Sequence, residues 1–501
     1  MKVFDEKKEG CKAGELVIRG RDALPFFASL VFGLAAHTFM LTNKIPVDDD
    51  ICNFFNKGAT TVSGRYGLEL LRLVMPDVSM PWIYGIMSLL LIAAAVCLIV
   101  RIFNIQSKVM QVLLSAVFIS FPAETGTLSY MFTCAPYALA LLMAVSAVYV
   151  FSSGVRGRWI ISPLLLIFSC SIYQGYFAFA SGFCVLLLVK FLLERDKSTG
   201  EIMLRGVKML AMLLLSAGLY GVTVLIAGKL AGVPVLDVVN KEQSLPMRIA
   251  VAYSAYLHTI FSGYFGYVRS GASRAMHVIV IAFTAICVAA SILPRRDVKR
   301  TLLLLVCLFL LPLSCYCLYM LADNGYIHSL ALYPFAVIYV LAAMVMDNFI
   351  PERASVLRTA VGAAMVVIIA GNIYFANSFY LKSYLQYENT KAFYSTVLAQ
   401  AMQTEGFDKN TKLAIIGERE LPDYGDNGAL DFSTFQLPGN NIMRTTHAQD
   451  IIKNYLGCDI AFADEAECEE IRSSAEFSEM PVFPYYGSVK NNGGTVVVKL
   501  S

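Results

Sequence analysis

The chain has 501 residues, of which 57% are hydrophobic and 15% are charged, with a formal net charge of +3. Soluble domains are typically about 25% charged. Because the apolar residues fall in blocks of roughly 18 to 25, long enough to span a bilayer as helices, an ordinary soluble protein is excluded. We therefore expect a lipid bilayer, and not nucleic acid, as the surroundings of this protein.

The apolar blocks predict about eleven membrane helices. Residues 1–22 are predicted to form a polar tail, and no small-residue cleavage site follows the first block, so this block is expected to stay as an anchor. The predicted helices cover 23–42, 82–100, 110–121, 131–151, 159–173, 177–193, 207–231, 276–293, 301–321, 326–346 and 356–375.

Basic residues gather in alternate loops, whereas the three short intervening loops carry no Lys or Arg. The basic loops of a membrane protein lie on the cytoplasmic side. This alternation predicts a multi-pass protein of the cell membrane with a cytoplasmic N-terminus. Eleven spans then place the C-terminal part of the chain outside.

The tail from residue 377 onward lacks apolar blocks and carries 17 acidic residues against 10 basic ones. A helical stretch at 388–403 precedes short β-like runs at 412–416, 459–462 and 495–500. We predict an all-α polytopic membrane protein, with a membrane domain at 23–376 and a small extracytoplasmic α/β domain at 377–501. Cys458 and Cys468 are candidates for a disulfide in that domain.

The first outer loop contains three adjacent carboxylates, Asp48, Asp49 and Asp50, followed by Arg65 in a Ser-Gly-Arg-Tyr-Gly segment. Adjacent carboxylates at an apolar boundary cost free energy unless they are paired or bind a cation. They could form a solvated turn that ends the helix. The alternative is an acid–base or divalent-metal site, with Arg65 suited to a phosphate and the apolar residues of 68–75 lying along the membrane interface.

Other polar residues interrupt the predicted outer loops. Glu124 lies in a charge-free loop, where it would be solvated or cap a helix unless it belongs to a site. Tyr173 and Gln174 break an apolar run and suit either a hairpin turn or sugar hydroxyls. His328 follows a tight turn and is either an interfacial residue or part of a site.

Asp49-Asp50-Ile51 followed by Gly64-Arg65 resembles the first outer loop of bacterial serotype-converting membrane glucosyltransferases, the Gtr family of the GT-C superfamily. Two further segments are similar to that family: Phe121-Pro122-Ala123-Glu124 with Leu128-Ser129-Tyr130, and Ser171-Ile172-Tyr173-Gln174. The resemblance covers the first 180 residues and is mainly topological beyond them. Asn53 and Phe54 stand where relatives often carry an Arg.

The resemblance implies transfer of a hexose, most simply glucose, from a polyprenyl-phosphate sugar to a surface polysaccharide or lipid-linked glycan. Asp49 or Asp50 would be the general base, and the other would orient it or bind a divalent metal ion. Arg65 would hold the donor phosphate. The remaining candidates for substrate binding are Asp48, Glu124, Tyr130, Tyr173, Gln174 and His328.

Three alternatives stay open from the sequence. The enzyme could transfer another sugar, such as mannose, galactose or arabinose. The chain could instead be a transporter or flippase of lipid-linked sugar, although its apolar blocks are nearly free of the mid-membrane charges that transporters use. It could also be a scaffold that displays the acidic tail.

Overall fold

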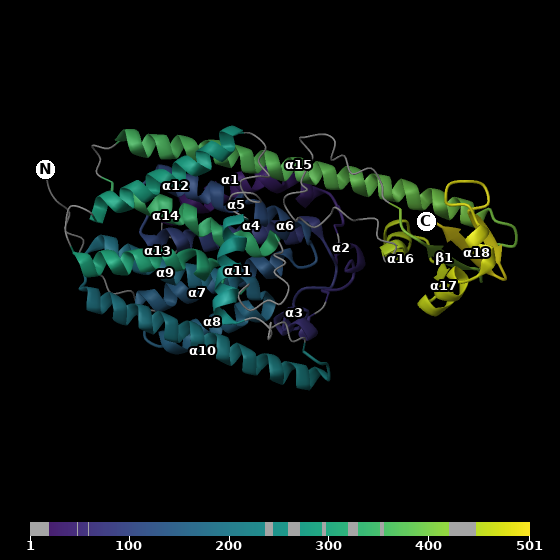
Figure 1. The fold of residues 1–501 in the computed structure, drawn as a ribbon, viewed down its shortest axis with the longest axis horizontal. Helices are drawn as coiled ribbons and strands as arrows, with labels where there is room; N and C mark the ends of the chain where they lie inside the picture. Colours follow the sequence, from purple (N-terminus) through teal and green to yellow (C-terminus); the bar gives the residue numbers. More distant parts are fainter. Residues whose placement is uncertain are drawn as a thin grey trace.

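The computed structural model describes residues 20–47, 49–58, 60–235, 244–258, 271–292, 297–318, 329–350, 355–419 and 447–501. A bundle of helices forms the larger part of the molecule, and one long helix, α15 (Ser355–Met402), runs along the bundle and beyond it into a small α/β domain (Figure 1). The C-terminal domain therefore projects from one end of the bundle.

The bundle contains the apolar helices that the sequence predicts. Their bounds are α1 (Gly20–Thr42), α4 (Pro81–Phe103), α5 (Lys108–Ile119), α7 (Cys134–Ser153), α8 (Arg158–Ile172), α9 (Phe177–Glu194), α10 (Thr199–Ala231), α12 (Gly271–Ile292), α13 (Val298–Cys315) and α14 (Val337–Asn348), with a 3₁₀ segment, η5 (Ser329–Ala336), before α14. The helix α11 (Leu245–His258) lies within a region that the sequence suggests is a loop.

Eight helices of the described residues are long and apolar enough to cross a membrane, and a bent pair would make nine. Two shorter apolar helices, 158–172 and 275–291, coincide with the remaining predicted spans. The prediction of an all-α polytopic protein with a small C-terminal α/β domain is thus confirmed. The side of the membrane on which each end lies remains a prediction.

The bent pair joins α5 to α6 (Pro122–Ser129) at an angle of 47°. Pro122 lacks an N–H and occupies the first turn of α6, so the chain breaks after Ser120 and starts a new helix. The sequence predicts a loop here and leaves open whether Glu124 is solvated, caps a helix or belongs to a site, but the segment is a helix and every residue of α6 is buried. The solvated alternative is wrong because α6 is covered by η5 and α15, which lie far away in the sequence.

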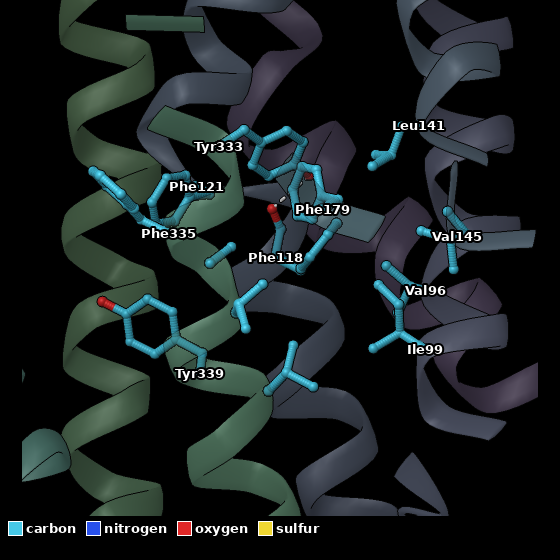
Figure 2. Close-up of a cluster of buried hydrophobic side chains, with 14 of the residues drawn as sticks. Val96, Ile99, Phe118, Phe121, Leu141, Val145, Phe179, Tyr333, Phe335 and Tyr339 are labelled. Atoms are coloured by element: carbon cyan, nitrogen blue, oxygen red, sulfur yellow. Dashed lines mark hydrogen bonds between the residues drawn. The ribbon is translucent and has the colours of Figure 1, made fainter. Parts of the chain in front are cut away.

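An aromatic cluster packs behind this bend (Figure 2). The Phe121 and Tyr333 rings are stacked with centroids 5.8 Å apart, and Phe118 lies 5.0 Å from Tyr333. The Tyr333 hydroxyl donates a 3.0 Å hydrogen bond to the Phe118 carbonyl in the last turn of α5, which also accepts a 3.4 Å bond from the Phe121 N–H. The bend is therefore held by contacts with η5.

The basic turns of the bundle meet at the end opposite the C-terminal domain. Arg101 pairs with Asp22, and the Asp347 carboxylate accepts hydrogen bonds from the backbone N–H groups of Gln106 and Ser107 at the start of α5. Arg300 donates a 2.8 Å bond to the Lys197 carbonyl. The loops that the charge pattern groups together are thus neighbours in space.

The C-terminal domain has a four-stranded sheet of order β2-β1-β4-β3. The strands are β1 (Lys412–Ile416), β2 (Ala461–Phe462), β3 (Val489–Asn492) and β4 (Thr495–Lys499). β1 is parallel to β2 and β4, and β3 and β4 form an antiparallel hairpin whose turn uses Gly493 and Gly494 at positive φ.

The two cysteines that the sequence offers for a disulfide in this domain, Cys458 and Cys468, are both free thiols. Residue 377, the predicted start of this domain, lies within α15.

Candidate functional site

The segment that follows α1 forms a short helix, α2 (Asp49–Cys52), at the end of the bundle that faces the C-terminal domain (Figure 1). Asp50 is fully buried, and its carboxylate accepts bonds from the Lys44 ammonium, from Ser79 Oγ at 2.6 Å and from the Phe132 N–H at 3.2 Å. Lys44 also donates to Ser79 Oγ at 2.7 Å. Asp50 therefore anchors α2 to the membrane part of the protein.

Asp49 is exposed on the same helix and interacts electrostatically with Arg65. Arg65 immediately precedes α3 (Tyr66–Leu71), and its Nη1 donates a 3.0 Å hydrogen bond to the Tyr137 hydroxyl. Its guanidinium lies 5.4 Å from the centroid of the Tyr173 ring, which stacks on Tyr137 at 4.4 Å. The Nε of Arg65 is buried and has no hydrogen-bond partner among the described residues.

Gln174 fixes the backbone just before Arg65. Its Nε2 donates to the Ser63 carbonyl at 2.7 Å and to the Tyr220 hydroxyl at 2.9 Å, and Tyr220 in turn donates to the Gly64 carbonyl at 3.0 Å. Gly64 has a φ of +77°, and a Cβ there would lie 2.8 Å from the Tyr220 oxygen. The segment thus needs glycine at this turn.

The helix α3 packs closely against the end of α8. A Cβ on Gly67 would lie 2.8 Å from the Ser171 carbonyl oxygen, so only glycine allows this approach. Leu70, Leu73 and Val74 are exposed, as expected for a segment whose apolar side lies along the membrane interface. Arg72 in the same segment pairs with Glu69 and Asp77.

Glu124 lies deeper, in α6. Its side chain is buried, and neither carboxylate oxygen has a hydrogen-bond partner among the described residues. The residues close enough to interact electrostatically with it include Tyr176, Tyr333 and Tyr380. An unpaired buried carboxylate is costly, so this residue has an environment typical of a functional group.

Tyr380 connects this tyrosine group to the first helix. Its hydroxyl lies 2.8 Å from Nδ1 of His37, while Nε2 of His37 lies 2.9 Å from the Ile119 carbonyl. With Nε2 donating to that carbonyl, Nδ1 accepts from Tyr380. The end of α5, just before the bend, is therefore fixed from α1 and α15 as well as from η5.

The structure brings Asp49, Arg65, Tyr173 and Gln174 together and places Asp50 beside the Tyr130–Phe132 turn, with Tyr130 buried. Glu124 belongs to the separate tyrosine group described above. Asp48 and His328 lie outside the described residues.

The site also contains four residues that were not predicted from the sequence: Lys44, Ser79, Tyr137 and Tyr220. Lys44 is six residues from its partner Asp50, a spacing that could have suggested the pair. The other three are far from their partners in the sequence and reach the site only through tertiary packing.

Within the described residues, no three His, Cys, Asp or Glu side chains gather as a metal site would require. Lys44 and Ser79 already occupy the Asp50 carboxylate oxygens, so a cation that bound there would first have to displace the Lys44 ammonium. These contacts favour an orienting role for Asp50 over metal binding.

No curated protein matches the chain. A family model described as "Glucosyl transferase GtrII" matches residues 38–346, more than half of the chain. The match spans α2, Arg65, α6 and the tyrosine group up to Tyr333, and it agrees with the resemblance seen in the sequence. It assigns glucosyltransferase activity and implies a sugar donor and an acceptor. The chain belongs to the GtrII glucosyl transferase family.

Proposed function

We propose that this protein transfers glucose from a polyprenyl-phosphate glucose donor to a surface polysaccharide or lipid-linked glycan at the outer face of the cytoplasmic membrane. Family membership supports the sugar and the reaction class. One observation carries the rest: Arg65 presents a buried Nε–H without a partner, beside the exposed carboxylate of Asp49, at one end of a membrane bundle.

Arg65 is suited to the donor phosphate. The nearby Tyr137 hydroxyl, followed in smaller part by Tyr173, Tyr220 and Asp49, raises the pKa of the guanidinium above its ordinary value. The side chain therefore keeps its charge at every physiological pH. Because Tyr137 and Tyr173 hold it in one place, its free N–H group is preorganised to bind an oxyanion.

Asp49 is the general base in this proposal. The acceptor hydroxyl gives its proton to the Asp49 carboxylate, and its oxygen forms a bond with the anomeric carbon of glucose. The bond between that carbon and the phosphate oxygen breaks, and polyprenyl phosphate leaves with its negative charge beside Arg65. The leaving group is already a phosphate, so the reaction mainly requires a base and correct positioning.

The other candidate residues have supporting roles. Asp50 orients α2 through Lys44 and Ser79, so that Asp49 faces outward. Glu124 accepts hydrogen bonds from the hydroxyls of the donor sugar or of the acceptor. Tyr130, which is buried in the turn beside Asp50, stays a candidate for substrate binding. Asp48 and His328 stay predictions as substrate-binding residues.

The proposed orientation rests on charge. The turns rich in Lys and Arg lie together at the end of the bundle opposite Asp49 and Arg65. The positive-inside rule places that basic end in the cytoplasm. Asp49, Arg65 and the C-terminal domain then lie outside, where a lipid-linked donor can enter from the membrane and a glycan from the water.

The test compares the surface glycans of cells that lack the chain with those of cells that carry wild-type protein, the Asp49→Asn variant or the Glu388→Gln variant. Glu388 is an acid on α15 that pairs with Lys391 and serves as the matched control. We expect one additional glucose branch with wild type and Glu388→Gln, and none with Asp49→Asn at equal protein level in the membrane. Full glucose addition by Asp49→Asn would reject Asp49 as the base, and no glycan change with wild type would reject the proposed function.

A further inference from the structure

The helix α2 carries Asp49, the proposed base, and is called the catalytic segment below. One of its residues lies inside the core of the C-terminal domain. Ile51, next to Asp50, has 0% of its surface exposed and belongs to the hydrophobic core of that domain, not to the core of the bundle. The residues of that core come from α15, from the sheet and from the segment before β2: Tyr394, Val397, Leu413, Ile451, Ile452, Val496 and Val498.

A second contact joins the C-terminal domain to α2. The hydroxyl of Tyr455, at the end of η8 (Ile451–Tyr455), donates a 3.2 Å hydrogen bond to the backbone carbonyl of Asp50. The rings of Tyr455 and Phe54 are perpendicular (89°) with centroids 5.3 Å apart, and the ring of Tyr387 in α15 lies 5.8 Å from that of Tyr455. The contact is therefore both polar and aromatic.

The helix α2 has only four residues, too few to be stable without tertiary contacts. It is held on one side by the Asp50 carboxylate, which binds groups of the membrane part, and on the other side by Ile51, which fills the C-terminal core. Asp49 projects from this doubly held turn and is exposed. Its position relative to Arg65 thus depends on both parts of the protein.

We propose that the C-terminal domain positions the catalytic segment, with Ile51 and Tyr455 as the positioning residues. This inference rests on the proposed function, because it assigns the domain a role in placing Asp49. The family match ends at residue 346, so it assigns no role to this domain. In this proposal the C-terminal domain contributes to transfer because it holds Asp49 in position.

The experiment compares Ile51→Ala with Ile45→Ala in the purified full-length protein. Ile45 is a matched control, since it is equally buried, lies six residues earlier and packs in the core of the bundle. We measure kcat and the donor KM with polyprenyl-phosphate glucose, and hydrogen exchange of the peptides covering 49–56 and 447–456.

We expect Ile51→Ala to lower kcat by tenfold or more with the donor KM within twofold, and to speed exchange in both peptides. Ile51→Val, which keeps most of the side chain, should restore kcat to within threefold of wild type. Tyr455→Phe should lower kcat by about threefold, since it removes only the hydrogen bond to the Asp50 carbonyl. Ile45→Ala should keep its kcat and leave exchange in 447–456 unchanged.

An Ile51→Ala protein with wild-type kcat, or one whose exchange in 447–456 matches wild type, would overturn the inference. If Ile51→Ala fails to accumulate, Ile51→Val and Tyr455→Phe decide the matter, and unchanged exchange and kcat in both would overturn it. A wild-type protein that transfers no glucose would instead contradict the proposed function, while the exchange data would still report whether the two parts are coupled.

Discussion

Asp50 and Glu124 are both buried carboxylates in the part of the bundle that lies toward the C-terminal domain, and Cys134 lies close enough to interact with each of them. Their surroundings differ. Asp50 accepts bonds from an ammonium, a hydroxyl and a backbone N–H, whereas Glu124 has no hydrogen-bond partner among the described residues.

The difference separates a structural acid from a functional one. A buried carboxylate with three donors stabilises the fold and has little remaining capacity to bind a substrate. A buried carboxylate without donors destabilises the fold, and such groups are retained where a ligand supplies the missing bonds. The comparison therefore supports the proposal that Asp50 holds α2 and that Glu124 binds substrate.

Of the two buried carboxylates, Glu124 should have the larger effect on transfer when it is replaced. Glu124→Gln keeps the shape but removes the charge, and hydrogen bonds to charged groups contribute about 1.5–3 kcal/mol, so we expect transfer to fall by roughly 10- to 100-fold. The thermal unfolding temperature should stay equal to that of wild type or rise, because Gln avoids the burial of a carboxyl group that has no hydrogen-bond partner among the described residues. Transfer at the wild-type rate, or a clear loss of stability, would break the comparison.

Replacing Asp50 should act first on stability. In Asp50→Asn the Lys44 ammonium loses its ionic partner, and we expect a loss of about 1–3 kcal/mol in unfolding free energy. Adding Lys44→Met should recover part of that loss, since no unpaired ammonium remains. Calorimetry of the purified single and double variants checks this, and an Asp50→Asn protein as stable as wild type would contradict the assignment.

Asp450 provides a milder case outside the membrane. Partial burial raises the pKa of its carboxyl above the ordinary 3.8, opposed by His447 and Lys453. A carboxyl whose pKa is raised by folding contributes stability below pH 3.8, and this contribution is lost as pH rises through the folded pKa. Asp450→Asn should therefore unfold at a slightly higher temperature than wild type near pH 7, with the difference vanishing below pH 3.8. If the difference in unfolding temperature between Asp450→Asn and wild type instead grew as the pH fell, the predicted effect of burial on Asp450 would be contradicted.

Much of the fold follows from local patterns. Apolar blocks identify the spans, because a bilayer requires about 20 apolar residues per helix. The short strands 412–416 and 495–499 follow from their β-branched and aliphatic runs. The long continuity of α15 was missed because its polar half lacks the apolar pattern that marks a span.

The site was only partly predictable. Asp49, Arg65, Tyr173 and Gln174 were chosen from their residue types and order, and the structure brings them together. The burial of α6 and of Ile51 could not be predicted, because each is covered by segments hundreds of residues away. The pattern of apolar residues in a segment indicates which of its faces is apolar, but it does not indicate which distant segment covers that face.

Binding of polyprenyl phosphate to the purified protein tests the central claim most directly, namely that Arg65 holds the donor phosphate while Asp49 performs the chemistry. We predict that Arg65→Lys weakens binding at least tenfold, because an ammonium lacks the planar donors of the guanidinium. Asp49→Asn should bind at least as tightly as wild type and yet transfer no glucose. Wild-type affinity in Arg65→Lys together with wild-type transfer in Asp49→Asn would contradict the account.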